Sequence, residues 1–196
     1  MSSLVGVLAL QGAFSEHEHM LTSLGTKSVA VRTPDDLAGI DAIILPGGES
    51  TTISMLLESS KVFDPLKQMI GEGLPVLGTC AGMILLANEV SDGRADQKSF
   101  AAIDISVRRN SFGRQIASFE SDLKVKGLTN SFRAVFIRAP GVEKVGDSVE
   151  ILATVDTHGQ TEVPVLCKSG PILVSSFHPE LTADSRIHQI FLSLIK

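Results

Sequence analysis

Cys80 lies between two apolar runs, in the segment LPVLGTCAGM that begins at Leu74. Gly78 and Gly82 flank it, a spacing typical of a nucleophile elbow with cysteine in the serine position. Such a turn strains its central residue, and the glycines remove side chains that would collide there. We expect the thiol at the carboxyl edge of a sheet, at a helix N-terminus that favours the thiolate, with the N–H of Ala81 free to bind an oxyanion. The alternative is a small, inert core cysteine beside a tight turn.

His178 and Glu180 follow an apolar strand near the end of the chain, in the sequence HPE. A catalytic thiol needs a base that takes its proton and returns it to the leaving amine, and the base needs an orienting carboxylate. His178 and Glu180 supply both roles from one loop that Pro179 stiffens. A histidine in an ordinary turn is the alternative for HPE alone, but the elbow cysteine favours the catalytic interpretation.

The remaining histidines lack a comparable setting; they are His17, His19, His158 and His188. His17 and His19 flank Glu18 on a predicted helix. No cluster with ligand spacing completes a metal site there, so we expect a solvated or interface face and no bound metal.

A glycine pair, Gly47 and Gly48, follows the predicted strand 42–45 and leads through Glu49 into a helix. Its exposed N–H groups could cradle a phosphate, yet the loop lacks both the P-loop and the dinucleotide-binding patterns. An oxyanion hole is the better interpretation. A plain turn with Ser50 or Thr51 as the helix cap is compatible with it.

Short apolar runs alternate with helix-like segments in the first half of the chain, which predicts βαβ units and a parallel sheet. The expected strands are residues 4–10, 28–32, 42–45 and 75–78. The expected helices are residues 14–24, 51–60, 63–69 and 81–88.

The second half has more β character. Strands are expected at residues 103–108, 115–119, 134–138, 149–155, 162–167 and 172–176, followed by a helix at 184–195. No repeat or long linker divides the chain, so residues 1–196 are expected to form a single domain. The polar segment 89–99 is the best candidate for a mobile surface loop.

Composition excludes several classes of function. The chain has 196 residues, 43% of them hydrophobic, and a net charge of -5 without a lysine or arginine run. These features give no reason to expect nucleic acid or a membrane surface as a partner. The apolar run 4–10 is far shorter than the roughly 20 residues of a membrane-spanning helix. Two cysteines and no secretory signal favour the reduced cytoplasm.

The motifs PGG, GxCxG and HPE, in this order, resemble those of the class I (triad) glutamine amidotransferases. More narrowly, the chain resembles the PdxT/SNO family, the glutaminase subunit of pyridoxal 5'-phosphate synthase. The segments that carry this likeness are GVLALQGAFSEH, LPGGEST, GTCAGMILLA, RNSFGRQIASFE, FIRAP and SFHPELT. Together they span nearly the whole chain and are far more specific than any one triad motif.

The resemblance implies a flavodoxin-like, three-layer mixed sheet with helices on both faces, and hydrolysis of L-glutamine to L-glutamate and ammonia without a cofactor. It implies Cys80 as nucleophile, His178 as base and Glu180 as its orienter, acting through a γ-glutamyl thioester. The ammonia would pass to a separate TIM-barrel synthase subunit of the PdxS/SNZ type. The implied glutamine contacts are Gly47, Gly48, Glu49, Arg109, Ile137 and Arg138.

Substrate chemistry agrees with these contacts, because the carboxylate of glutamine suits arginine and its ammonium suits an acidic or carbonyl partner. Surface salt bridges are the alternative for Arg109 and Arg138. The segment 89–99 departs from the family pattern and is expected to leave the chemistry untouched.

Two other functions are compatible with parts of the pattern. A glutaminase could serve histidine, purine or anthranilate synthesis, although RNSFGRQ and FIRAP argue against it. A non-catalytic protein could use the elbow cysteine to sense oxidation. The waste of unattended glutamine hydrolysis indicates an isolated chain that is nearly inactive, with Gln11 in the segment 9–17 as a candidate relay from the synthase to the glycine loop.

Overall fold

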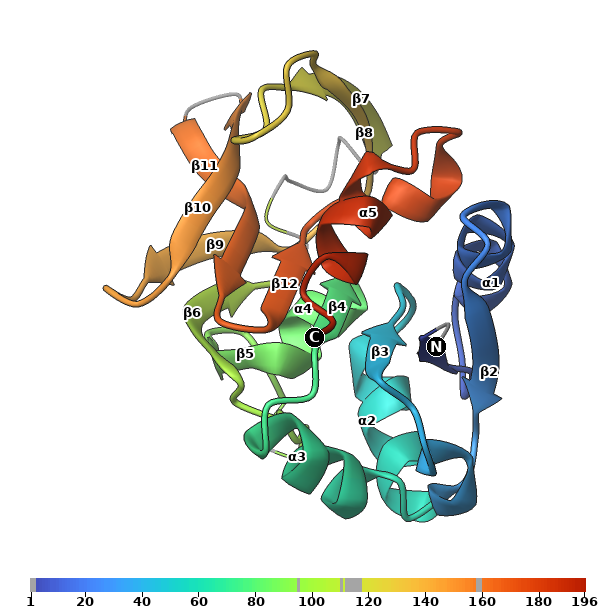
Figure 1. Cartoon of the computed structure of the whole chain (residues 1–196). Helices are drawn as coiled ribbons and strands as arrows, with labels where there is room; N and C mark the ends of the chain where they lie inside the picture. Colours follow the sequence, from blue (N-terminus) through green and yellow to red (C-terminus); the bar gives the residue numbers. More distant parts are fainter. Residues whose placement is uncertain (1–2, 95, 110, 112–117, 158–159) are drawn as a thin grey trace.

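The computed structural model describes the chain except for residues 1–2, 95, 110, 112–117 and 158–159. A seven-stranded sheet with the order β10-β11-β12-β4-β3-β1-β2 forms its centre (Figure 1). The strands β2, β1, β3, β4 and β12 run parallel, and β11 and β10 continue the sheet antiparallel. Their bounds are β1 Leu4–Leu8, β2 Lys27–Val31, β3 Ala42–Leu45, β4 Val76–Thr79, β10 Glu150–Thr157, β11 Gln160–Ser169 and β12 Ile172–Ser175.

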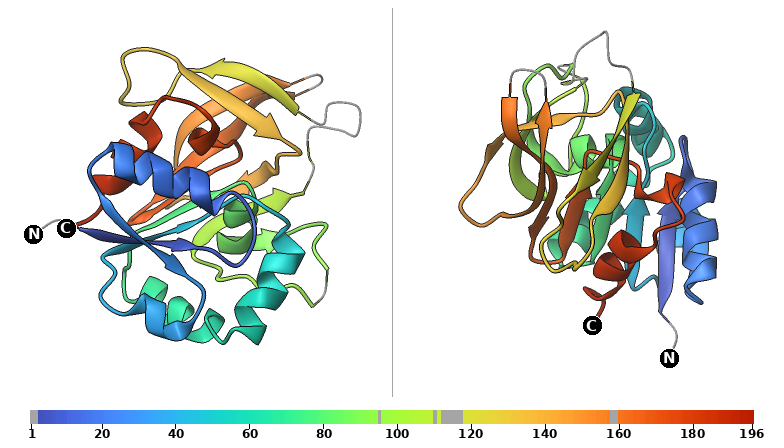
Figure 2. Two further views of the ribbon diagram at one scale, coloured as in Figure 1. Left: turned by 90° about the vertical axis from the view of Figure 1, so that its right-hand side faces the viewer. Right: turned by 90° about the horizontal axis from the view of Figure 1, so that it is seen from above.

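Helices cover both faces of this sheet (Figure 2). On one face, α2, α3 and α4 contribute to one apolar cluster; on the other, α1 and α5 contribute to a second. Strand β3 shows the division, since Ile43 and Leu45 belong to the first cluster and Ala42 and Ile44 to the second, as expected of a strand buried on both faces. The helices are α1 Phe14–Ser23, α2 Ser50–Ser59, α3 Phe63–Gly71, α4 Ala81–Leu86 and α5 Arg186–Leu192, with 3-10 turns η1 Pro34–Leu37 and η2 Pro179–Leu181.

Two small sheets complete the layers. Strands β5 (Ala87–Val90), β6 (Ile103–Arg108) and β9 (Gly141–Val145) form one, and the antiparallel pair β7 (Ser118–Leu123) and β8 (Phe132–Ile137) forms the other. The buried side chains of β6 join the cluster of α2, α3 and α4, and those of β8 join the cluster of α1 and α5. The predicted mixed sheet with helices on both faces is therefore confirmed.

Several expected boundaries differ from the structure. The helix expected at 81–88 ends at Leu86, because Ala87 adopts an extended conformation and pairs with Ile103. The polar segment 89–99 thus begins inside strand β5 and not in a loop. Strand β9 was not expected, and the last helix is shorter than 184–195. The strand expected at 115–119 begins among residues outside the described part; the described strand is β7.

Among the described residues, none of the helices has the length and apolar character needed to cross a bilayer.

Candidate active site

Cys80 occupies a sharp turn between β4 and α4, with φ 49° and ψ -101°. Its N–H donates to the carbonyl of Ser175 at 2.8 Å, so the turn is fixed to β12 at the carboxyl ends of the parallel strands. A Cβ on Gly78 would lie 2.8 Å from the carbonyl of Gly82, and one on Gly82 would lie 2.0 Å from the carbonyl oxygen of Leu45. Both glycines are required by close backbone packing, as the elbow pattern predicts.

His178 lies three residues after the end of β12 and is fixed to β8, because its N–H donates to the carbonyl of Val135 at 2.9 Å. Its Nδ1 lies 2.7 Å from Oε1 of Glu180, and both side chains are buried. Burial lowers the pKa of His178, but hydrogen bonds and charge attraction with Cys80 and Glu180 outweigh it and raise the pKa to about 10. The imidazole is therefore protonated at neutral pH, with Nδ1 turned to the carboxylate.

Glu180 is held ionised by its neighbours. Burial raises the pKa of its carboxyl. The nearby His17 and the hydrogen bond and charge of His178 lower this pKa by a larger amount, so the net shift is downward. The carboxylate thus stands behind the His178 ring and stabilises its positive charge.

The expectation of a solvated or interface face at His17 is wrong. His17 is fully buried, and its Nε2 lies 3.4 Å from Oε2 of Glu180. Met20 and Leu21 share this buried face at helical spacing, a signal that the sequence did contain. His19, two residues along the same helix, is exposed as expected. His158 lies outside the described residues.

The glycine loop after β3 is held by the segment that follows β1. The carbonyl of Gly47 accepts from the N–H of Ala13 at 3.0 Å, and the N–H of Glu49 donates to Oε1 of Gln11 at 2.9 Å. The alternative that Ser50 or Thr51 caps the helix is wrong. Instead, Oε2 of Glu49 accepts from the N–H and hydroxyl of Thr52 at 2.9 and 3.0 Å and caps α2.

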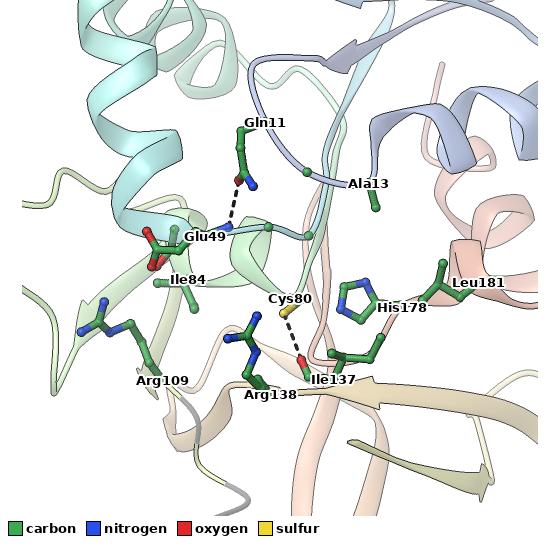
Figure 3. A pocket seen from close by; sticks show the side chains of 14 residues that line it. Gln11, Ala13, Glu49, Cys80, Ile84, Arg109, Ile137, Arg138, His178 and Leu181 are labelled. Atoms are coloured by element: carbon green, nitrogen blue, oxygen red, sulfur yellow. Dashed lines mark hydrogen bonds between the residues drawn. The ribbon is translucent and has the colours of Figure 1, made fainter. Parts of the chain in front are cut away.

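A cavity of about 380 Å³ opens above Cys80 (Figure 3). Its wall brings together residues that the sequence singled out: Gln11, Gly47, Gly48, Glu49, Cys80, Arg109, Ile137, Arg138 and His178. Sequence reasoning missed five more: Gly12, Ala13, Ser50, Ile84 and Leu181. Glu180 lies behind His178, and Ala81 follows Cys80 at the start of α4.

The two arginines enter the cavity differently. Arg109 donates to the hydroxyl of Thr51 and to the carbonyl of Asp92, both at 3.1 Å, and its Nε lies 3.8 Å from the Asp92 carboxylate. Segment 89–99 therefore contacts a residue of the cavity wall through Asp92. Arg138 has φ 44°, a strained value for a non-glycine residue, and points toward Cys80 (Figure 3).

A mixed sheet with helices on both faces and an elbow cysteine beside a histidine and a carboxylate is the arrangement of a class I glutamine amidotransferase. A solved structure of a glutamine amidotransferase matches this chain with a TM-score of 0.90 and 47% sequence identity, over 97% of this chain and 98% of that one. PurLQS from Thermotoga maritima matches with a TM-score of 0.74 at 17% identity and full coverage of both chains, which shows the fold alone.

The chain belongs to the SNO glutamine amidotransferase family, which matches residues 7–196. It is 50% identical, over 100% of its length and 99% of the relative's, to the pyridoxal 5'-phosphate synthase subunit PdxT of Mycobacteroides abscessus. It is 51% identical to PdxT of Herpetosiphon aurantiacus over 97% of this chain and 99% of that one. The resemblance that the sequence motifs indicated is confirmed.

Proposed function

We propose that the chain hydrolyses L-glutamine to L-glutamate and ammonia through Cys80, His178 and Glu180. We further propose that it delivers the ammonia, in the cytoplasm, to a TIM-barrel synthase subunit of the PdxS/SNZ type that makes pyridoxal 5'-phosphate. One observation carries the catalytic assignment: the elbow thiol faces an imidazole whose Nδ1 lies 2.7 Å from a buried carboxylate. Relatives that are 50% and 51% identical to this chain bear the name pyridoxal 5'-phosphate synthase subunit PdxT, which supports the proposal that the ammonia passes to such a synthase.

The first half of the reaction forms a γ-glutamyl thioester. The thiolate of Cys80 attacks the amide carbon, and N–H groups of the Gly47-Gly48 loop and Ala81 bind the tetrahedral oxyanion. Nδ1 of His178 is engaged with Glu180, so Nε2 carries the proton that the leaving amine needs. The C–N bond then breaks, and ammonia departs with that proton.

The second half releases glutamate. His178 is now neutral and takes a proton from water, whose oxygen attacks the thioester carbon. Collapse of the second tetrahedral adduct breaks the C–S bond and restores the Cys80 thiolate beside the His178 imidazolium. Glu180 keeps its negative charge throughout and stabilises the imidazolium at both ends of the cycle.

The cavity wall offers complementary groups for the two ends of glutamine. Arg109 and Arg138 suit the α-carboxylate, since guanidinium groups bind carboxylates with paired hydrogen bonds. For the ammonium we assign Glu49 and the carbonyl of Ile137, which lies 3.9 Å from the Cys80 sulfur. Oε2 of Glu49 is taken by the cap of α2, so Oε1 is the oxygen that remains for substrate.

Gly47→Ala should disable the site without unfolding the chain. A Cβ at Gly47 would lie 2.3 Å from Cε1 of His178 and 3.4 Å from Cβ of Cys80, so the imidazole must move. We expect the glutaminase rate to fall about 100-fold or more, because a shift near 1 Å is enough for such a loss. Gly71→Ala is the matched control, since nothing lies within 4 Å of its added Cβ. Equal rates in the two variants would contradict the assigned geometry.

Gln11 is the residue we propose to couple the synthase to the glycine loop. Its Oε1 holds the N–H of Glu49, while Ala13 holds the carbonyl of Gly47, so a movement of this segment would reorient the loop peptides. We expect the isolated chain to be nearly inactive, the synthase subunit to activate it, and Gln11→Ala to remove most of that activation while still forming the complex.

The measurement is glutamate release by the chain alone and with its synthase subunit, with complex formation followed separately. Gln68→Ala is the control, because the side-chain amide of Gln68 donates to Glu72 at the end of α3, and Gln68 is not among the residues of the cavity wall. Full activity of the isolated chain would remove the regulatory proposal. A protein that only sensed oxidation would release no glutamate under either condition, which would remove the proposed function itself.

A further inference from the structure

Two buried histidines lie behind the Glu180 carboxylate and take no part in the proposed reaction. His17 in α1 and His188 in α5 are both fully buried, and Nδ1 of His17 lies 2.9 Å from Nε2 of His188. Nε2 of His17 lies 3.4 Å from Oε2 of Glu180 and 3.3 Å from the hydroxyl of Thr79. Buried polar groups are costly unless they are paired, so this arrangement needs a reason.

The contacts select one tautomer for each ring. If His17 carried its proton on Nδ1, its Nε2 lone pair would face the Glu180 carboxylate, and His188 would bury an Nδ1–H with no acceptor among the described residues. With both protons on Nε2, His188 donates to His17, and His17 donates toward Glu180 and Thr79. On the His188 ring only the Nδ1 lone pair is then left without a partner, and a lone pair is less costly to bury than an N–H donor.

Burial also favours the neutral form of both rings. Burial lowers the pKa of His17 against the attraction of Glu180 and Glu16, with the nearby His178 acting in the same direction as burial. Burial and the proximity of His17 lower the pKa of His188 to about 3, against the attraction of Glu180. A neutral N–H can hold a carboxylate oxygen without neutralising it, so the full charge of Glu180 remains available to His178.

We propose that His17, held in its tautomer by His188, is a positioning residue: its Nε2–H fixes Oε2 of Glu180 so that Oε1 meets Nδ1 of His178. Oε2 makes no other hydrogen bond among the described residues, and Nε2 of His17, at 3.4 Å, is the donor placed to supply one. Without this donor the carboxylate would be free to rotate. The proposal rests on the proposed function of Glu180. It extends the polar chain behind Cys80 to α1 and α5, which border the sheet on the face opposite α2 and α3.

His17→Leu tests the consequence for activity. We expect kcat with the synthase subunit to fall about tenfold or more, as for other residues that orient a reacting group, while KM changes little because no substrate contact is lost. Loss of the donor should raise the pKa of Glu180, so the acid limb of the kcat profile should move to higher pH. His17→Gln, which restores an N–H donor, should recover part of the loss. His19→Leu, an exposed change on the same helix, is the control.

Nitrogen NMR of histidine in the full chain tests the tautomers without any assay of activity. We expect His17 and His188 to be neutral, with the proton on Nε2, from pH 6 to 8, and Glu180→Gln to shift the His17 Nε2 signal. A charged His17, an Nδ1–H tautomer, or a His17 signal indifferent to Glu180→Gln would overturn the proposal. Correct tautomers together with wild-type kcat and pH profile in His17→Leu would overturn it as well. A failure of the proposed function is distinct, because His178→Asn would then also leave activity unchanged.

Discussion

Cys80→Ala is expected to abolish glutamine hydrolysis and leave the fold intact. The change removes the one sulfur that faces the cavity, and alanine fits the elbow because its side chain ends at the same Cβ. No other described group on the cavity wall offers a comparable nucleophile in contact with His178. Glutamate release in the presence of the synthase subunit measures the loss, and a thermal unfolding curve shows whether the fold is retained.

Cys167→Ala is the matched control for the thiol. Cys167 lies in β11 with no exposed surface, and burial raises its pKa to about 12, so it is neither accessible nor readily ionised. A glutamine-mimicking electrophile should therefore label Cys80 alone, visible as one modified peptide by mass spectrometry. Modification at Cys167, or equal activities of the two variants, would show that the nucleophile is misassigned.

The central sheet was predictable because its signal is local. Strand β3 of this sheet, and strand β6 of the small sheet beside it, were placed at the bounds that the structure shows, since a buried run of branched side chains between turn residues has few alternatives. Strands β5 and β9 were missed. Their sequences, ANEV and GVEKV, carry charged residues at the centre, and the strands exist because β6 offers a partner on each side. Pairing of this kind is a tertiary effect that a local pattern does not contain.

The candidate site likewise has a part that local motifs predicted and a part that depends on contacts between distant residues. The elbow, the glycine loop and HPE are each short motifs with a mechanical reason, and the structure brings them around one cavity. The His17 and His188 contact joins residues 171 positions apart, and no local pattern specifies it. Asp92 was missed for a related reason: its role is to hold Arg109, and a polar residue in a polar segment gives no sign of its partner.

The ionised pair of His178 and Glu180 has a defined pH range. The pKa of His178 is raised from its ordinary 6.5 to about 10, so its stabilising contribution is complete below pH 6.5 and is lost as pH rises through about 10. The pKa of Glu180 is lowered from 4.5, so its contribution is present above that pH and is lost as pH falls through the lowered value. Both groups are charged at neutral pH, where the enzyme is expected to work.

His178→Asn is expected to be nearly as damaging as loss of the thiol, on the order of 1,000-fold or more in kcat, because the members of a triad act as a unit. Asparagine keeps a polar side chain but cannot carry the proton to the leaving amine. Glu180→Gln should be milder, since the amide oxygen still accepts from Nδ1 and the ring stays in place, while the charge that stabilises the imidazolium is lost.

The titration of His178 separates the placement of its ring from the charges that stabilise it. In Glu180→Gln the pKa of His178 should fall from about 10, because burial continues to lower it and one of its two stabilising partners has lost its charge. In Cys80→Ala it should also fall, for loss of the other partner. The titration of His178 can be followed by NMR in both variants and in the wild type. If Glu180→Gln were less active than His178→Asn, or if the pKa of His178 were the same in all three proteins, the roles assigned to the histidine and the carboxylate would be wrong.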